Sequence, residues 1–387
     1  MLTASPRVVP SLLRQMNERR VLSALQSNGP ASRADLCRQT GISGPTVTRV
    51  VATLIEAKLV EEEDEPRQRA VGRPGKIVRL ARSGVGVLGC VVGAYQTEVV
   101  VAGLDGEVDP DGIRTFATPS NYDELVSACV KTARELMLRR PGALLGLGLS
   151  LPGLLNRREG RSIVSPKAHQ LDGRNLGNDL SERLQLEVAV LQECHALCWA
   201  ERTYGAARDA ADFAMLDISD GLGLGVMQEG RIVQGRSGLA GELGHITVQL
   251  NGKPCGCGNR GCLETVATDT ALAGAVGARL GRKLDIEEIV AGVRSGTLDC
   301  DRELNEVLDY LAVATAAVIN IFNPGKLFIY GRLLDARDDL FAQLLERAER
   351  RTLGPSWADC EVVRARGNKR LGVVAAACHG ATHGRPE

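Results

Sequence analysis

Residues 241–264, GELGHITVQLNGKPCGCGNRGCLE, carry three of the eleven cysteines of the chain within eight positions. One imidazole and three thiols follow one another closely there: His245, Cys255, Cys257 and Cys262. One nitrogen and three sulfur ligands complete tetrahedral zinc and leave no position for water, which is typical of a structural site. The intervening glycines and polar residues cannot form a core. The sequence therefore predicts a structural Zn²⁺; the alternative is a glycine-rich loop with reactive surface thiols.

The body around this loop, from residue 86 onward, alternates apolar strand-like runs with helical patterns. The predicted strands are 89–92, 99–104, 144–149, 188–191, 213–218, 223–228 and 327–330. The predicted helices include 125–138, 196–204 and 304–322. Strands that alternate with helices predict an α/β fold.

The composition restricts the class of protein. The 387 residues are 44% apolar, with 47 basic and 47 acidic side chains, which excludes a disordered chain, a collagen and a uniformly basic nucleic-acid coat. No run of 18 apolar residues is present, and the amino terminus lacks the apolar stretch of a signal peptide. We expect a soluble, cytoplasmic protein with no membrane partner, whose thiols are reduced.

The charge is distributed unevenly along the chain. Residues 1–82 hold 14 basic and 8 acidic side chains, a net charge of +6, so the remainder carries −6. A basic module on an acidic body predicts a polyanionic partner for the first segment alone.

Three short helices are predicted in this basic segment. A helical apolar pattern runs over 12–25, and the Ser32-x-x-Asp35 arrangement caps a second helix that Gly41 ends. Ser43 is the predicted cap of a third helix, whose buried stripe is Val47, Val50, Val51 and Leu54. The opposite face of that helix carries the predicted DNA-contacting residues Thr46, Thr48, Arg49 and Thr53.

Two short strands, 58–61 and 77–80, follow the third helix and predict the hairpin of a winged helix. Arg73 lies in the compact turn between them and is predicted to enter a minor groove. We place the acidic run 61–65 on the solvent side of this wing. The alternative for the whole segment is a small helical bundle that contacts proteins.

The motif 241–245, followed by 255–264, closely resembles the signature of the ROK family of repressors, open reading frames and kinases. The resemblance covers nearly the whole chain, including the segments 84–106, 151–154, 165–166, 219–225 and 323–324. With the winged helix, the chain looks like the regulator branch of the family. The resemblance implies an actin-like, ribonuclease H-like body of two α/β lobes around a cleft, and an oligomer, either a homodimer or a homotetramer.

The resemblance divides the chain into three parts. Residues 1–83 are the expected winged helix-turn-helix domain. Residues 84–194, joined by a carboxyl-terminal helix at about 370–385, are the expected first lobe, and 195–369 are the second lobe with the zinc loop.

Three elements depart from the pattern of the family's kinases: two segments of the nucleotide site, and the pair that supplies the catalytic base. The kinases carry Asp-x-Gly-Gly-Thr-Lys after a strand, whereas the carboxylate position here is Val91, followed by Tyr95 and Gln96 in place of the hydroxyl and the cation. The paired glycines near adenosine correspond to 330–332, Tyr-Gly-Arg. The remaining phosphate loop, 219–223, is weak evidence, because glycine also fills tight strand turns.

The kinases' Asn-Asp pair, which supplies the catalytic base, corresponds here to Gln192 and Glu193, each one methylene longer. The resemblance thus implies a degenerate base at Glu193, no catalytic residue and loss of phosphoryl transfer.

The sugar side of the cleft is better preserved. Glu242, His245 and Glu264 match family positions that bind sugar hydroxyls, and the resemblance adds Gln192 and Glu193 to this wall. Lys167, with His169 nearby, replaces a neutral amide, and the hypothesis is an anionic ligand such as a sugar phosphate that pairs with Lys167. The alternative is a vestigial pocket in which Glu242 and Glu264 only support the zinc loop.

The predicted function is a sequence-specific transcriptional regulator, most simply a repressor, that binds a double-stranded DNA operator and responds to a sugar or sugar-phosphate effector. Effector and operator affinities would be linked reciprocally. Two rival functions are an active ATP-dependent sugar kinase with a DNA-binding module, and a DNA-binding protein that responds to no ligand.

Overall fold

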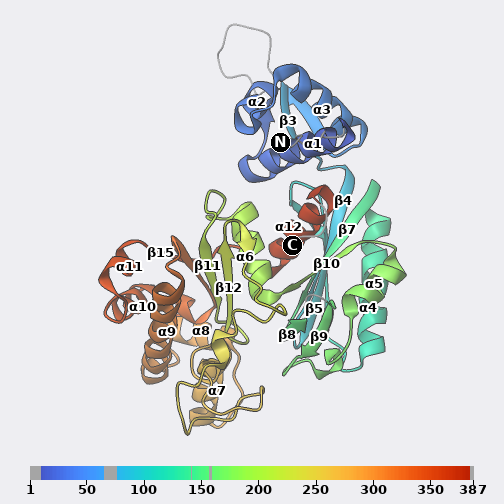
Figure 1. The fold of residues 1–387 in the computed structure, drawn as a ribbon. Helices are drawn as coiled ribbons and strands as arrows, with labels where there is room; N and C mark the ends of the chain where they lie inside the picture. Colours follow the sequence, from blue (N-terminus) through green and yellow to red (C-terminus); the bar gives the residue numbers. More distant parts are fainter. Residues whose placement is uncertain (1–9, 65–75, 141, 157–158, 384–387) are drawn as a thin grey trace, which may run out of the picture. The chain divides into compact units, whose positions relative to one another are not determined.

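The structure is a computed structural model that describes residues 10–64, 76–140, 142–156 and 159–383 (Figure 1). The chain divides into two compact units. The first unit comprises Met1–Leu149, Leu176–Val190 and Val373–Pro386, and the second comprises Ser150–Asn175 and Leu191–Gly372. The winged-helix residues thus belong to the same unit as the first half of the body; the domain boundaries expected at 83 and 194 stay predictions.

The amino-terminal module has the three predicted helices, α1 (Pro10–Asn28), α2 (Arg33–Thr40) and α3 (Gly44–Glu56). The capping box at the start of α2 is confirmed, because the Ser32 and Asp35 side chains each bond the other's backbone N–H. Gly41 ends α2 in the left-handed conformation at φ 69°. Ser43 occupies the predicted N-cap position of α3, but its hydroxyl makes no hydrogen bond to the helix backbone and instead donates to Thr46 Oγ1 (3.0 Å).

The wing is a hairpin of β2 (Val60–Asp64) and β3 (Lys76–Leu80), paired from Val60↔Leu80 to Asp64↔Lys76. A short strand that was not predicted, β1 (Ala31–Ser32), pairs with β3 and completes a three-stranded sheet. Val78, at its centre, is fully buried.

The acidic run does not lie wholly on the solvent side of the wing. The Glu62 side chain is 13% exposed and forms ion pairs with Arg33 (2.7 Å) and Lys76 (3.5 Å). Glu61 is turned toward Arg79 and the segment after β3. The prediction was wrong for these two residues, because strand alternation alone does not reveal which basic partner faces a carboxylate.

The first unit also contains a five-stranded sheet in the order β10-β7-β4-β5-β6. Its strands are β4 (Gly84–Val92), β5 (Gln96–Ala102), β6 (Val108–Ala117), β7 (Gly142–Leu151) and β10 (Val188–Gln192). Cys90 of β4 faces Cys129 of α4 (Tyr122–Arg139), whereas the adjacent Gly89 lies against Val373 of α12 (Lys369–His383). Because neighbouring strand residues point to opposite faces, α4 and α12 cover the two sides of this sheet.

The second unit repeats the same strand order, β13-β12-β11-β14-β15. Its strands are β11 (Phe213–Asp217), β12 (Gly223–Gln228), β13 (Arg231–Ile232), β14 (Lys326–Tyr330) and β15 (Glu361–Arg364). In each unit an antiparallel meander of three strands is followed by two further strands on the other side of the first. This repeated order confirms the expected α/β fold.

The remaining helices of the body are α5 (Leu176–Leu184), α6 (Glu193–Tyr204), α7 (Asp269–Leu280), α8 (Ile286–Arg294), α9 (Asp301–Phe322), α10 (Leu340–Glu349) and α11 (Gly354–Ala358). Two short strands, β8 (Leu154–Asn156) and β9 (Arg161–Val164), form a separate hairpin. By length and composition α9 is apolar enough to cross a bilayer. Its buried face, from Leu304 to Ile319, belongs to the core of the second unit, which accounts for that composition.

Candidate functional site

The exposed face of α3 carries the residues predicted to contact DNA. Thr48 and Arg49 are exposed and Thr46 is half-buried, near the amino-terminal end of the helix. On the opposite side the predicted stripe is buried: Val47, Val50, Val51 and Leu54. This apolar stripe holds the helix on the module, and the exposed residues remain available for base edges.

The other predicted DNA contacts are placed differently or lie outside the described residues. Thr53, one turn further along α3, accepts a hydrogen bond from Arg14 Nη2 of α1 (3.4 Å) and donates to Arg49 O (3.2 Å). Arg73 is not among the described residues. The DNA-contacting role of all five residues stays a prediction.

The four predicted metal ligands lie together. The ligand atoms of His245, Cys255, Cys257 and Cys262 are all within 4.8 Å of one another. The Cys257 and Cys262 sulfurs are 3.7 Å apart, and Cys255 Sγ is 3.7 Å from His245 Nδ1. Two sulfurs bound to one tetrahedral zinc at 2.3 Å would be about 3.8 Å apart. The donor set and its spacing therefore fit a metal ion that is coordinated tetrahedrally.

The backbone of the loop explains why these thiols converge. Cys255 N donates to Asn259 O (2.8 Å), and Gly261 N donates to Lys253 O (2.8 Å), which folds the chain back on itself. Gly261 has φ 69°, and a Cβ there would lie 1.6 Å from Gln249 O, so only glycine fits. Such a loop has little apolar surface of its own to bury, so a metal would supply the stabilisation.

His245 joins the thiol cluster to two carboxylates. Its Nδ1 faces Cys255 and lies 3.6 Å from Glu264 Oε1, whereas its Nε2 lies 3.8 Å from Glu242 Oε2. If Nδ1 binds the metal, Nε2 carries the proton and points toward Glu242, which fixes the ring orientation. Burial raises the pKa of Glu242, although the charge of His245 opposes this.

Gln192 extends this wall from the end of β10. Its Nε2 donates to Glu242 Oε1 (3.3 Å) and to Gly153 O (3.3 Å). The side chain is 6% exposed, and Oε1 has no hydrogen-bond partner among the described residues. A buried acceptor without a donor favours a ligand hydroxyl at this point.

Lys167 lies at the other end of the same set of residues. Its Nζ donates to the backbone oxygen of Asp220 and lies 3.4 Å from Thr270 Oγ1, while the side chain remains exposed. The adjacent Gly221 lies near Glu264, since a Cβ on it would be 3.3 Å from Glu264 Oε2. Gln192, Glu242, His245 and Glu264 thus form one continuous series, which the backbone of Asp220 and Gly221 connects to Lys167. The role of these five side chains as ligand-binding residues stays a prediction.

His169 takes no part in this series. It is exposed, and its Nδ1 lies 2.9 Å from Asp172 Oδ2. Of the two potential cations at 167 and 169, Lys167 is therefore the one that belongs to this series.

Glu193 faces a different set of residues. Its Oε1 accepts a bond from Lys369 Nζ at 2.6 Å, and the same ammonium lies 3.1 Å from Asp217 Oδ2 and 3.3 Å from Ser219 Oγ. Asp217 Oδ1 also accepts from the Ser219 backbone N–H (3.0 Å) and hydroxyl (2.6 Å). Although burial opposes it, the carboxylates of Asp217 and Glu193 raise the pKa of Lys369 well above its usual range. The ammonium group of Lys369 therefore lies at this end of the phosphate loop, and its charge neutralises the charge of Glu193.

Departures at the two other nucleotide elements are equally clear. Near the end of β4, Val91 provides no carboxylate, and in the following turn Tyr95 is 79% exposed. After β14, Arg332 forms ion pairs with Glu287 (2.9 Å) and Asp335 (3.0 Å).

Asp269 holds the backbone that follows β14, and this role was not predicted from the sequence. Its two oxygens accept bonds from the backbone N–H groups of Arg332 (2.7 Å) and Leu333 (2.8 Å). Burial raises its pKa to about 7, although these hydrogen bonds oppose the shift. Asp217 and Lys369 were missed as well. The available signals were a charged residue at the end of a buried strand and a lysine at the start of an apolar helix, but neither signal identifies the partner of the charge.

The comparisons with known proteins agree with this arrangement. The model of the ROK family matches residues 87–379, and that of the MarR family matches residues 14–70. The xylose repressor of Bacillus subtilis is 26% identical over 328 residues, covering 84% of each chain. The DNA-binding transcriptional dual regulator NagC of Escherichia coli is 28% identical over 342 residues, covering 84% of this chain and 82% of NagC.

Solved structures give the same result. A ROK family transcriptional regulator, a homologue of the E. coli MLC protein, matches with a TM-score of 0.80 and 27% identity, covering 96% of this chain and 97% of its own. The ROK hexokinase of Thermus thermophilus matches with a TM-score of 0.63 and 27% identity, covering 76% and 97%. The family predicted from residues 241–264 is therefore confirmed: the chain belongs to the ROK family and carries a MarR-family module at its amino terminus.

Proposed function

We propose that this protein is a sequence-specific transcriptional repressor that acts in the cytoplasm as a symmetric oligomer and is released from its operator by a sugar or sugar phosphate. The combination that carries the proposal is a winged helix with an exposed Thr48 and Arg49, joined to a body whose sugar-side residues converge. The likeness to repressors over 84% of the chain, whose names specify xylose and N-acetylglucosamine, supports a small carbohydrate as the effector.

The same proposal includes the loss of kinase activity. A transferred phosphoryl group needs a carboxylate that binds Mg²⁺ and a base that accepts the sugar proton. Val91 cannot bind Mg²⁺, and Glu193 is held by Lys369 at 2.6 Å. The hexokinase relative supports the rival enzymatic function, which the second experiment below tests.

We further propose that the thiol cluster binds one structural Zn²⁺ through His245, Cys255, Cys257 and Cys262. The metal would neutralise the thiolates and hold the His245 ring, so that Glu242 and Glu264 keep their positions beside the ligand. Those two carboxylates would accept hydrogen bonds from vicinal sugar hydroxyls, and Gln192 Oε1 would accept another.

Replacing Arg49 by Ala should relax operator preference. An arginine that pairs with a base edge contributes about 1–3 kcal/mol of discrimination, so affinity for the selected operator should fall by roughly 5- to 150-fold. Affinity for unrelated DNA should change less than threefold. The operator is first obtained by selection from random duplexes with the wild-type chain, and both affinities are measured at one stated salt concentration.

The matched control is Arg20→Ala, which removes the same charge from an exposed position on α1. This substitution should lower the affinity for the operator and the affinity for unrelated DNA to a similar, small extent. Equal losses from Arg49→Ala and Arg20→Ala would contradict base recognition by α3, and a wild-type chain that selects no sequence would contradict the proposed function itself.

An effector should raise the melting temperature of the protein and lower its operator affinity. We expect this from one sugar in a panel of xylose, N-acetylglucosamine, neutral hexoses and hexose phosphates, with a stronger response to a phosphorylated form because of Lys167. Addition of ATP and Mg²⁺ should change neither result and release no ADP. Coupling of about 1–3 kcal/mol corresponds to a 5- to 150-fold change in operator affinity.

Lys167→Met distinguishes the two ligand classes, since it should remove the preference for a phosphate and leave binding of a neutral sugar intact. Steady ADP release with a hexose would establish the kinase instead. Operator binding that no sugar changes would identify a ligand-independent regulator with a vestigial pocket.

A further inference from the structure

The winged helix and the first half of the body share one hydrophobic core. Val21 of α1, Leu54 of α3 and Val78 of β3 belong to the same buried cluster as Val85 of β4 and Leu104. Residues of α12 complete the cluster: Val374, Ala377 and Cys378. The DNA-binding module is therefore packed onto the first unit by apolar side chains on both sides of the domain boundary expected at residue 83.

The chain between β3 and β4 consists of Ala81, Arg82 and Ser83 alone. Ala81 is fully buried; its N–H donates to Leu59 O (3.0 Å), and its carbonyl accepts from Leu104 N (3.0 Å). One residue of the connection is thus hydrogen-bonded to the winged helix and to the body at once. A flexible linker has no such fixed partners.

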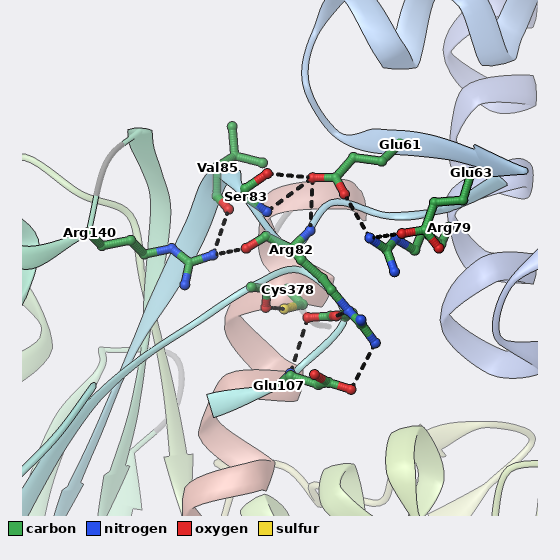
Figure 2. A network of polar contacts seen from close by, with 11 residues as sticks. Glu61, Glu63, Arg79, Arg82, Ser83, Val85, Glu107, Arg140 and Cys378 are labelled. Atoms are coloured by element: carbon green, nitrogen blue, oxygen red, sulfur yellow. Dashed lines mark hydrogen bonds and ion pairs between the residues drawn. The ribbon is translucent and has the colours of Figure 1, made fainter. Parts of the chain in front are cut away.

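Glu61 holds the connection from the side of the wing (Figure 2). Its Oε1 accepts three bonds, from Arg82 N (3.2 Å), Ser83 N (3.0 Å) and Ser83 Oγ (2.9 Å). Its Oε2 lies 3.4 Å from Arg79 Nη2, an ion pair within the hairpin. Although burial opposes it, the hydrogen bonds from Ser83 and the charge of Arg79 lower the pKa of Glu61, so the carboxylate is ionised at neutral pH.

Arg82 and Arg140 hold the connection from the side of the body. Arg82 Nε donates to Asp105 Oδ2 (2.7 Å), and its Nη2 donates to Glu107 Oε1 (3.0 Å), in the turn between β5 and β6. Arg140, after α4, donates to the backbone oxygens of Arg82 and Val85. Figure 2 shows these contacts converging on the three-residue connection from different elements.

We propose that Glu61 and Arg82 fix the orientation of the winged helix on the first unit and thereby determine which spacing of operator half-sites two copies of this chain accept. The inference rests on the proposed function, specifically on operator binding by a symmetric oligomer. Each inserted base pair turns one half-site by about 34° and moves it by about 3.4 Å relative to the other. A module that is held at a fixed angle cannot follow such a change, whereas a loosened module can.

The experiment uses full-length protein and the operator selected by the wild type, in versions with one base pair removed and with one, two and five base pairs inserted between the half-sites. We expect the wild type to lose at least tenfold in affinity on a single insertion. Glu61→Ala, and Glu61→Ala combined with Arg82→Ala, should lose less than threefold on the same insertion. Their affinity for one isolated half-site should stay within twofold of the wild type.

Glu62→Ala is the matched control, because it removes the same charge from the next residue of β2 and breaks ion pairs that stay inside the winged helix. It should keep the spacing preference of the wild type. Glu61→Gln serves as a milder second variant should Glu61→Ala fail to unfold cooperatively; the amide loses the charge-assisted bonds and should give an intermediate tolerance.

The outcomes separate the inference from the proposed function. A spacing penalty in the Glu61 variants equal to that of the wild type overturns the inference and leaves the operator-binding function standing. The inference is also overturned, and the operator-binding function again left standing, if the Glu61 variants lose the same affinity at every spacing and at the single half-site. A wild-type chain that selects only single half-sites overturns both this inference and the proposed pairing of two copies.

Discussion

Replacing Cys262 by Ser should abolish metal binding and lower the stability of the second unit by about 3 kcal/mol or more. Structural zinc contributes an apparent 10–16 kcal/mol in small zinc modules, most of which is consumed in ordering the loop. Cys262 is fully buried and lies 3.7 Å from Cys257 Sγ, so the serine would leave a three-ligand site with a neutral hydroxyl in the fourth position. A loss of this size corresponds to a fall in melting temperature of roughly 6–12 °C for a unit of about 200 residues.

Metal analysis and thermal unfolding check this expectation. The wild type should hold one zinc per chain, Cys262→Ser less than a tenth of that, and a chelator should bring the wild type to the melting temperature of the variant. Cys300→Ser is the control, because Cys300 is equally buried and lies outside the cluster. A variant that retains one zinc would exclude Cys262 as a required ligand, and a variant that lacks zinc but melts with the wild type would show that the loop is stable without the metal.

Replacing Lys369 by Met should destabilise the protein by about 3–5 kcal/mol, since removal of one partner from a buried ion pair leaves the other charge uncompensated. Two carboxylates would be left, Asp217 with a 6% exposed side chain and Glu193 with 21%. Adding Glu193→Gln to Lys369→Met should recover part of the loss. Denaturant unfolding of the single and double variants measures both effects.

A surface ion pair gives the comparison. Lys326 lies 3.2 Å from Glu361, but the two side chains are 33% and 64% exposed, so Lys326→Met should cost less than about 1 kcal/mol. Equal losses from the two lysine substitutions would contradict the neutralising role of Lys369. If Lys369→Met kept its stability and gained ATP turnover with a sugar, the ammonium would be only an inhibitor of an intact kinase site.

Local patterns in the sequence predicted local structure well. The capping box at Ser32, the left-handed Gly41 and the buried stripe of α3 are confirmed, because each depends on residues within one or two helical turns. The metal cluster was also predictable, since three of its four ligands lie within eight residues. Strand β6 was missed. Its segment contains proline and glycine, which weaken a strand pattern but are tolerated at the edge of a sheet.

Long-range charge pairing could not be predicted. Lys369, Glu193 and Asp217 come from the starts of two helices and the end of a strand that lie far apart in the chain. Glu61 was placed toward solvent because a run of acidic residues is usually solvated, and the bonds from Arg82 and Ser83 follow a turn of the chain that the sequence does not reveal. Sequence patterns indicate which charged side chains stand out from their surroundings, whereas the tertiary fold determines which partners these side chains contact.

The three-residue connection between β3 and β4 bears on how this DNA-binding head could be transplanted. A chimera cut between residues 80 and 84 would leave Val78 and Leu80 without Val85 and Leu104, exposing apolar side chains at the seam. A graft that swaps operator specificity between regulators should therefore exchange the exposed residues of α3 in place, or else carry the turn at 103–107 and the middle of α12, residues 374–378, along with the DNA-binding module.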